Sequence, residues 1–373
     1  MQVTHRFRLY PNINQEEKLL ETLDLCRLIY NYFLSQWDSK AKIPSRLELQ
    51  AQLPEVKREK PELNKVHSKV LQMALYHLYS NLKALSRLKK SGKRVGRLRF
   101  KGKGWFKTFT YNQSGFKLIR TGKRLDLLYL SKIGDVPVRL HREVEGNIKQ
   151  VIIKKHNSGR WVACVCVEGH IPEETKQVRK AIGLDMGVKH FLTDSEGRQI
   201  ENLMFYEKSL RRIRILHRDL SRKKKGSENR ARQRMKLANL YEKLVNQRDD
   251  FLHKLSRFYA NNYDLIVVEN LNISNMVRNR NLAGKILDAS LGKFLHLLEY
   301  KAARAGVQVV KVNPRGTSRE GDKSLDRDYR ASLNILMRGW GSPKMPVEME
   351  PLLVEIPAST IIEAGSPPAL SRG

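Results

Sequence analysis

Cysteine is scarce in this sequence, and no zinc-binding pattern can be read from it. The three cysteines, Cys26, Cys164 and Cys166, form no C-x-x-C pair, which argues against a disulfide framework or a zinc site. The ten histidines show no H-E-x-x-H spacing. We therefore expect no zinc. Cys164 and Cys166 alternate with valines, so we expect them to be small core residues on one face of a strand.

Long apolar runs are also missing. No stretch approaches the roughly 18–20 apolar residues that a membrane span requires. The opening residues, MQVTHRFRLYPN, are too polar for a secretory signal. We expect a cytoplasmic protein without a membrane partner.

Negative charge is in short supply. The 71 Lys and Arg residues outnumber 38 Asp and Glu residues, which gives a formal net charge of +33. Such an excess favours a polyanionic partner, usually nucleic acid, and binding that weakens steeply with salt. A ribosomal-type or merely soluble basic protein is the alternative explanation.

Helical periodicity dominates residues 11–90, which predict a small helical bundle. Asn14, with Glu17 as a capping-box partner, predicts the start of its first helix. A later helix carries a stripe of leucines spaced by three or four residues. These are Leu71, Leu75, Leu78, Leu82 and Leu85.

Strand patterns surround this bundle in the sequence. Residues 3–9 alternate between the two faces of a strand, and alternation returns after residue 90. We expect the first strand to join the later sheet. Residues 1–10 and 91–172 would then form one β domain, with the helical bundle as an insertion.

Basic and aromatic residues interleave between residues 89 and 119. Such stretches suit nucleic acid, because lysines contact phosphates and aromatic rings stack on bases. We expect phosphate contacts from Lys101, Lys103 and Lys107. For the aromatic side chains, burial in the core is favoured over stacking. These are Trp105, Phe106, Phe109 and Tyr111.

Residues 179–340 predict a second, mixed α/β domain. Its pattern is three strands, a helix, a strand, a helix, a strand and a final helix, with a basic helical arm at 205–260. The tip of the arm and a later loop are candidates for binding nucleic acid, although a solvated charged face is the alternative for the tip. The candidates are Arg222, Lys223, Lys224, Lys225, Arg230 and, in the loop, Arg315.

Acidic residues fall at three special points of this domain. Asp185 ends its first strand, Glu269 ends its fourth, and Asp328 opens its last helix. Carboxylates that meet at the carboxyl edge of a sheet bind hard divalent cations, which can support phosphodiester cleavage. Taken singly, these residues are better explained as a turn residue, a surface residue and a helix cap. Together, on matching elements, they favour a metal site.

Three segments carry a family resemblance. GLDMGVKHFLTDSEG, LIVVENLNISNM and DRDYRASLNIL resemble the motifs of the RuvC-type, RNase H-like nuclease domain of TnpB (OrfB) proteins. Insertion sequences encode these proteins, which are relatives of type V CRISPR effectors. LRFKGKGWFKTFTY is similar to the signature of the family's β-barrel wedge domain, which a helical recognition domain interrupts. The resemblance implies an α/β multidomain fold of this kind over residues 1–340.

The resemblance also implies an activity. It places the catalytic acids at Asp185, Glu269 and Asp328, with Mg²⁺ or Mn²⁺ as their metal. It further implies an RNA-guided DNA endonuclease of a transposable element, with a guide RNA from the element end and double-stranded target DNA as partners. Family members are often called transposases and linked to DNA recombination, but no pattern here indicates strand transfer.

The sequence departs from the family pattern in two places. Where the family has a zinc ribbon, only residues 321–325 precede DRD, and Arg330 stands where the family usually has asparagine. A cation at Arg330 would compete with the metal or pair with a carboxylate. The alternative to an active nuclease is therefore a DNA-binding protein whose cleavage is weakened or lost. Its DNA binding would be either guided by RNA or independent of RNA. Residues 341–373 are rich in proline and are expected to be disordered.

Overall fold

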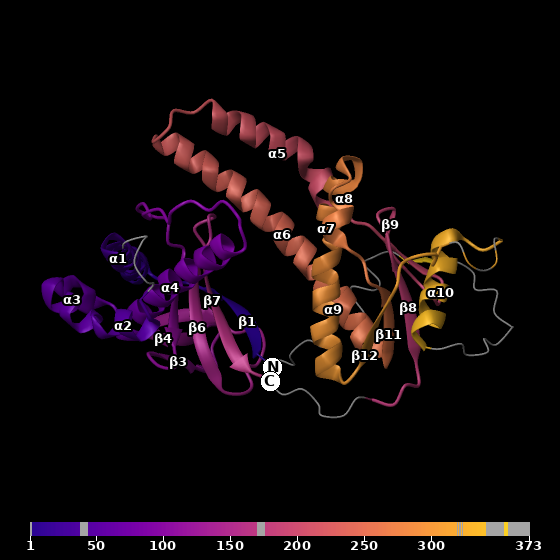
Figure 1. Ribbon diagram of the computed structural model, residues 1–373, viewed down its shortest axis with the longest axis horizontal. Coiled ribbons are helices and arrows are strands. Elements are labelled where there is room, and N and C mark those ends of the chain that lie inside the picture. The colour runs from indigo at the N-terminus through magenta and orange to yellow at the C-terminus, as the bar shows by residue number, and fades with distance from the viewer. Residues whose placement is uncertain are drawn as a thin grey trace. The chain divides into compact units, whose positions relative to one another are not determined.

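The computed structural model describes residues 2–37, 44–169, 176–318, 320, 322, 324–340 and 354–356. The chain forms two compact units, Met1–Gly169 and His170–Gly373 (Figure 1). The tail that the sequence predicts to be disordered lies outside the described residues, except for the short strand β13 (Val354–Ile356).

The first unit is built around one antiparallel sheet. Its strand order is β2-β6-β7-β1-β5-β4-β3, so β2 and β3 lie at opposite edges. Only three residues connect these two strands, and the sheet must therefore curl until its edges approach each other, as in a nearly closed barrel. The strands are β1 (Gln2–Leu9), β2 (Thr108–Asn112), β3 (Phe116–Ile119), β4 (Asp126–Leu130), β5 (Gly134–Arg139), β6 (Ile148–Lys155) and β7 (Trp161–Glu168).

The helices of the first unit all fall between β1 and β2 in the sequence. They are α1 (Ile13–Gln36), α2 (Arg46–Ala51), α3 (Leu53–Glu59), the 3₁₀ helix η1 (Pro61–Lys65) and α4 (Ser68–Lys90). Helix α1 starts two residues earlier than predicted, because Asn12 and Gln15 form the capping box. The predicted leucine stripe is largely confirmed, since Leu71, Leu75, Leu78 and Leu82 are buried.

The second unit contains a mixed sheet of order β12-β11-β8-β9-β10-β13. Strand β11 pairs in parallel with both β8 and β12, whereas β9 runs antiparallel to its neighbours. The strands are β8 (Ala181–Met186), β9 (His190–Asp194), β10 (Arg198–Glu201), β11 (Leu265–Glu269) and β12 (Gln308–Val312).

Among the described residues of the second unit, two helices follow β10, three follow β11, and one follows β12. They are α5 (Phe205–Ser221), α6 (Glu228–Asn262), α7 (Ile273–Met276), α8 (Arg280–Ala289), α9 (Leu291–Ala305) and α10 (Arg327–Trp340). The short helices α7 and α8 come before the single helix that the sequence predicts here. Of all helices in the described part of the chain, none is long and apolar enough to cross a membrane.

The two faces of this sheet are covered by different helices (Figure 1). Ile182, Leu184 and Val268 share a core with residues of α6 and α9. The alternate residues Leu265 and Val267 form a separate cluster with Ile335 of α10. Because strand side chains alternate between faces, Asp185 and Glu269 belong to the α10 face.

Helix α10 lies unusually close to β8 because Gly183 has no side chain. A Cβ atom placed on Gly183 would lie 2.2 Å from the carbonyl oxygen of Ser332 and 2.8 Å from the backbone nitrogen of Leu336. We expect Gly183→Ala to lower the free energy of unfolding by about 1–3 kcal/mol, because α10 must move away. Denaturant unfolding measures this change.

Gly284→Ala provides the matched control for that substitution. Gly284 lies inside α8, and a Cβ atom placed there would meet no neighbouring atom within 4 Å. Alanine should therefore raise the free energy of unfolding there by roughly 0.5–1 kcal/mol. Equal effects of the two substitutions would contradict the close approach of α10 to β8.

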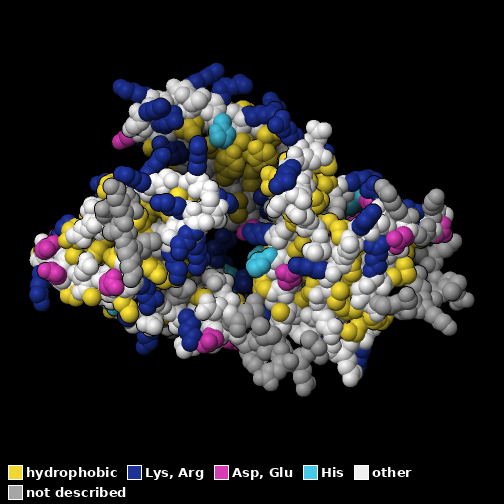
Figure 2. All heavy atoms as spheres, viewed as in Figure 1, with side chains coloured by type: hydrophobic (Ala, Val, Ile, Leu, Met, Phe, Trp, Pro, Cys, Tyr) yellow, Lys and Arg dark blue, Asp and Glu magenta, His cyan; other side chains and the backbone are white. Residues whose placement is uncertain are grey.

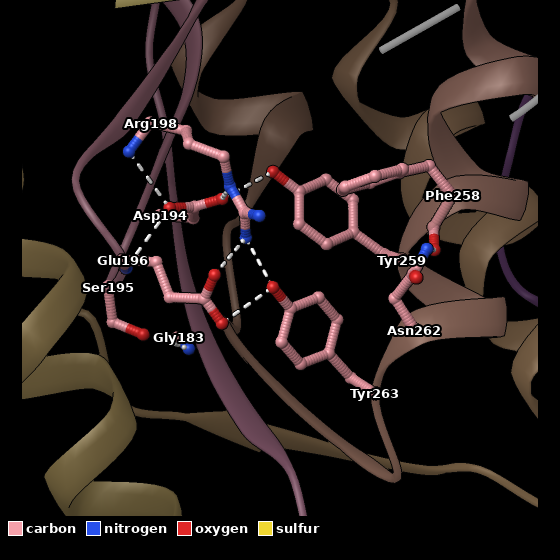
Figure 3. A network of polar contacts seen from close by, with 9 residues as sticks. All are labelled: Gly183, Asp194, Ser195, Glu196, Arg198, Phe258, Tyr259, Asn262 and Tyr263. Carbon is pink, nitrogen blue, oxygen red and sulfur yellow. Dashed lines mark hydrogen bonds and ion pairs between the residues drawn. The ribbon is translucent and has the colours of Figure 1, made fainter. Parts of the chain in front are cut away.

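A buried polar network fixes the β9–β10 turn to the end of α6 (Figure 3). Asp194, which is fully buried, accepts from Arg198 Nε at 2.7 Å and from the Tyr259 hydroxyl at 2.9 Å. The Tyr263 hydroxyl donates to Glu196 Oε1 at 2.7 Å and accepts from Arg198. The network therefore joins the turn beside β8 to the root of the α5–α6 arm.

Candidate active site and nucleic-acid surface

Asp185 and Glu269 lie next to each other at the carboxyl ends of two parallel strands. The register pairs Leu184 of β8 with Val268 of β11, so the following residues are Asp185 and Glu269. Residues in register on neighbouring strands point to the same face and are roughly 5 Å apart at their Cα atoms. The strand pairing therefore brings both carboxylates to the α10 face at one edge.

Asp328 approaches the same edge from the first turn of α10. Its neighbour Asp326 has a different role, because Asp326 Oδ1 accepts from the backbone N–H groups of Asp328 and Tyr329, at 3.0 and 3.2 Å. Asp326 thus caps the amino end of α10. The carboxylate of Asp328 therefore does not serve as the cap.

The electrostatics of Asp185 show that these carboxylates influence one another. Burial raises the pKa of Asp185 to about 7, and the charges of Glu269 and Asp328 add to that increase. The nearby guanidinium of Arg327 acts in the opposite direction. A carboxyl group that resists ionisation beside other acids is a feature of functional sites, where a cation would relieve the repulsion.

Glu269 is almost completely buried and is held by a loop residue. The Thr317 hydroxyl donates to Glu269 Oε1 at 2.6 Å. Burial raises the pKa of Glu269, while the hydrogen bond from Thr317 and the charge of Arg338 lower it. One oxygen of the carboxylate is therefore fixed by a short hydrogen bond at the edge where β11 ends.

The donor set suits a hard divalent cation, although the side chains are not gathered around one. Within residues that the structure describes, no three His, Cys, Asp or Glu side chains are close enough together to hold a metal ion. Arg327 donates instead to Asp328 Oδ1, from Nε at 3.1 Å and from Nη2 at 2.9 Å. The guanidinium of Arg327 therefore lies beside Asp328, as expected where negative carboxylates attract cations.

Arg330 does not face the acids, contrary to the expectation from the sequence. Its guanidinium donates to the carbonyl oxygens of Asp322, at 2.8 Å, and Ser318, at 3.1 Å. Arg327, not Arg330, is the arginine that lowers the pKa of Asp185. The expected position of Arg330 beside the acids is thus wrong, because its Nη1 and Nη2 atoms donate to backbone carbonyls instead.

The basic and aromatic loop before β2 is fastened to α1. The Asn31 side chain exchanges two hydrogen bonds with the backbone of Lys101, at 2.8 and 2.9 Å. The ammonium of Lys101 lies 5.1 Å from the Trp105 ring centroid, within range of a cation–π interaction. Lys103 and Lys107 are exposed, as phosphate contacts would require.

The aromatic residues of this loop divide between core and surface. Phe109 and Tyr111 are buried, and Phe106 is half-buried against the same core, as predicted. Trp105 instead is 65% exposed, and Phe100 is similarly exposed at 63%. The preference for the core is therefore wrong for Trp105, whose ring is available for stacking.

We expect Trp105→Ala to weaken binding of single-stranded nucleic acid by about 1–3 kcal/mol, the usual contribution of one stacked base. Trp105→Phe keeps an aromatic face and should retain most of the affinity. Fluorescence anisotropy with a labelled oligonucleotide at fixed salt measures both variants. Equal affinities of Trp105→Ala and the wild type would show that this ring does not stack on bases.

The tip of the α5–α6 arm is strongly basic. Figure 2 shows Lys and Arg side chains gathered over this tip. Arg222, Lys224 and Lys225 are exposed and Lys223 is half-buried. Arg230 donates to the carbonyl oxygens of Leu220 and Lys223, so it also holds the turn between the helices. Arg315, in the loop after β12, is exposed.

Sequence reasoning missed Thr317 and Arg327. Both touch the candidate acids, Thr317 through Glu269 and Arg327 through Asp328. Arg327 had one visible signal, its place inside the DRD segment. Thr317 had only its place five residues after the end of β12, which does not distinguish it from any other loop residue.

Three segments of the chain match known protein families. Residues 164–280 match the OrfB family of IS605-type insertion sequences, described as "Probable transposase". Residues 292–323 match the "Cas12f1-like, TNB domain". Residues 1–42 match a family described as "Helix-turn-helix domain", although residues 2–36 here form a strand followed by one long helix. The matched class is therefore that of OrfB-type transposases and Cas12f1-like proteins.

Similarity to individual proteins supports assignment to the TnpB/OrfB family. It is 29% identical over 320 residues to a Streptomyces pristinaespiralis protein named "Putative RNA-guided DNA endonuclease", covering 83% of this chain and 76% of that protein. It is also 29% identical over 334 residues to "Putative RNA-guided DNA endonuclease InsQ" of Escherichia coli K12, covering 84% and 81%.

Among solved structures, a Cas12f1 chain in a complex with single-guide RNA and target DNA is similar at a TM-score of 0.48. The sequences are 13% identical, and the match covers 90% of this chain and 98% of that one.

Proposed function

We propose that this chain is an RNA-guided DNA endonuclease of a transposable element, with Asp185, Glu269 and Asp328 as its catalytic carboxylates. The proposal is supported by β8, β11 and α10, each of which brings one acidic residue toward the same sheet edge, where Glu269 and Asp328 help to raise the pKa of Asp185. The names of the relatives from Streptomyces and Escherichia coli support the same activity.

The fold of the second unit supports a RuvC-type, RNase H-like domain. Three strands connected in sequence, β8 to β10, are followed by β11 and β12, which add in parallel on the other side of β8. This order, with an antiparallel second strand, is what the family resemblance leads us to expect. Ligands of such sheets bind at the carboxyl ends of the parallel strands, where the candidate acids lie.

Asp185, Glu269 and Asp328 would hold Mg²⁺, with Mn²⁺ as a substitute, because carboxylate oxygens are preferred ligands of hard cations. When bound, such ions activate water and stabilise the leaving oxygen in phosphodiester hydrolysis. Asp326 keeps the amino end of α10 capped, which fixes the starting point of the Asp328 side chain. Arg327, which is largely exposed, would place a positive charge beside the Asp328 carboxylate.

Guide RNA and target DNA are the proposed partners. The net charge of +33 and the exposed basic residues of both units suit a phosphate-rich partner of considerable length. In guided effectors, base pairing between RNA and DNA supplies sequence specificity, whereas the protein recognises backbone shape and a short flanking motif. This division of labour needs many phosphate contacts and few base contacts, as the lysine-rich surfaces would provide.

A binding protein with impaired cleavage is the second candidate. Two observations favour it: the described acids are not gathered into a metal-binding group, and the segment before α10 is too short to contain a zinc ribbon. Such a protein would retain the guide RNA and bind matching DNA without cutting it.

Reconstitution separates these candidates. The chain is co-expressed with RNA transcribed from the end of its own element and purified as a complex. It is then given DNA that matches the guide next to a randomised flank, with Mg²⁺ or with EDTA. Cleavage of matched DNA only, in Mg²⁺ only, supports the nuclease.

Guide-dependent binding without cleavage would support the second candidate instead. Failure of RNA to co-purify, together with failure to bind DNA, would overturn both. The randomised flank matters because the sequence does not reveal the flanking motif, so one fixed target could give a false negative.

A further inference from the structure

The loop that follows β12 is fastened to one side of α10. Three residues of α10 spaced four apart, Arg330, Asn334 and Arg338, make these contacts. Residues spaced by four on a helix lie on one stripe, so they face the loop together. We call the described residues of this segment, 313–318, 320 and 322, the α10-bound loop.

Asn334 is the buried centre of this arrangement. It is 4% exposed, and its Nδ2 atom donates to the carbonyl oxygens of Thr317 and Glu320, both at 2.7 Å. An amide nitrogen has two hydrogens, so both donors are used. The backbone at Thr317 is thereby held at a fixed distance from the axis of α10.

Arg338 secures the start of the same loop. Its Nη1 atom donates to the carbonyl oxygens of Asn313, at 2.9 Å, and Arg315, at 2.8 Å, while Nη2 contacts Glu320 Oε1 at 2.7 Å. The contacts of Arg330 at the other end complete the attachment. Because the planar guanidinium presents its donors in fixed directions, these bonds define a single loop path.

Thr317 uses this fixed position to reach Glu269. It is 3% exposed, and its hydroxyl oxygen lies 2.6 Å from Glu269 Oε1 and 3.1 Å from the carbonyl oxygen of Pro314. The carboxylate is the stronger acceptor of the two. The chain of contacts therefore runs from α10 through the loop backbone to one oxygen of a candidate ligand.

We propose that Thr317 is a positioning residue, which turns the Glu269 carboxylate so that its other oxygen is presented to a divalent cation, and that the α10-bound loop holds Thr317 in place. This inference rests on the proposed function, because it gives Glu269 the part of a metal ligand. Hydrogen bonds to ligating side chains commonly set ligand orientation, and their removal typically weakens metal affinity by about 10–100-fold.

The test compares side chains that differ by one hydroxyl. Thr317→Val keeps the shape of threonine and removes the donor, and Thr317→Ala against Thr317→Ser makes the same comparison without the methyl group. Mn²⁺ binding to the purified protein–RNA complex, without DNA, is followed by electron paramagnetic resonance of the free ion. The Mg²⁺ dependence of cleavage of matched DNA is measured in parallel.

We expect Thr317→Val and Thr317→Ala to bind Mn²⁺ about 10–100-fold more weakly than the wild type. Thr317→Ser should stay close to the wild type. Ser332→Ala is the control, because Ser332 is fully buried on α10 but its hydroxyl donates to the carbonyl oxygen of Tyr329, within the same helix. It should leave Mn²⁺ affinity unchanged, whatever its effect on thermal unfolding.

The outcomes distinguish the positioning role of Thr317 from the proposed nuclease function. If the wild type cuts and the hydroxyl-free variants bind Mn²⁺ as tightly as it does, the positioning role is wrong and the nuclease stands. If Ser332→Ala loses as much Mn²⁺ affinity as Thr317→Val, the effect is general loosening and the inference also fails. If the wild type neither binds Mn²⁺ nor cuts, the proposed function fails and the inference with it.

Discussion

Replacing Asp185 with asparagine should reduce cleavage of guide-matched DNA at least about a thousandfold, the scale of losing a catalytic group that acts together with others. The substitution keeps the size of the side chain but removes a negative charge from a group of carboxylates. Guide RNA retention and DNA binding should persist, because the basic surfaces are untouched. Single-turnover cleavage and gel-shift assays on one preparation measure the two properties.

The same substitution should not destabilise the protein. The pKa of Asp185 is raised from 3.8 to about 7 by burial and neighbouring acids, so its charge is disfavoured in the folded state. Without divalent cations, the wild type should lose stability at this group as pH rises from about 4 to about 7, and Asp185→Asn should lack that loss. Chemical denaturation across this pH range, in EDTA, checks the sign.

Asp326→Asn is the matched control for the loss of charge. This substitution keeps the side-chain oxygen that caps α10, since asparagine caps helices as well as aspartate does. It removes one negative charge within the same segment as Asp328. Cleavage should remain within about tenfold of the wild type; a loss as large as that of Asp185→Asn would assign catalysis to Asp326 as well.

Removing the Asp194 carboxylate should have the largest effect on stability. Asp194→Ala should lower the free energy of unfolding by about 3–5 kcal/mol, because Arg198 keeps its charge in a largely buried position after its main partner is gone. Tyr259→Phe removes one of the hydrogen bonds to this carboxylate and should cost about 1.5–3 kcal/mol. Urea unfolding followed by far-UV circular dichroism measures both.

Asp250→Asn is the comparison on helix α6. Its ion pair with Lys254 is 60% exposed on the aspartate side and should contribute less than about 0.5 kcal/mol. A second check is Asp194→Ala combined with Arg198→Met, which removes the unpaired charge and should recover part of the lost stability. No recovery would mean that the network stabilises the turn by its shape and not by its charges.

The sequence alone was sufficient for the strands that carry the candidate acids. Buried parallel strands have continuous apolar runs, such as LIVV in β11, and the residue that ends the run is easily identified. Side chains alternate between the two faces of a strand. Once the pairing of Leu184 with Val268 is known, this alternation places Glu269 on the same face of the sheet as Asp185. That register depends on contacts between distant segments, so periodicity in one strand does not supply it.

The contacts of the loop and of its arginines were beyond sequence reasoning. Because Arg330 lies two residues after Asp328, its charge was expected to compete with a metal ion for the carboxylates. The helix turns it toward the carbonyl oxygens of Ser318 and Asp322 instead. Backbone carbonyls have no signature in the sequence, so hydrogen bonds to them can be found only after the path of the loop is known.

Local signals were ambiguous in the first unit for a similar reason. Asn12 and Asn14 both precede a helical pattern, and only the bonds between Asn12 and Gln15 identify the true cap. Trp105 lies in the same aromatic run as Phe109 and Tyr111, yet it is outside β2 and remains exposed. Composition sets how many aromatic rings a core can take, but the path of the backbone decides which ones.

The position of Asp328 in the last described helix has a consequence for synthesis of the protein. The first two candidate acids leave the ribosome while α10 is still untranslated, and the close packing of α10 on Gly183 cannot yet form. At roughly 5–20 residues per second, the delay between Asp185 and Asp328 is on the order of ten seconds. Under the proposed function, the exposed basic residues of the first unit are thus available to RNA well before the chain carries all three carboxylates.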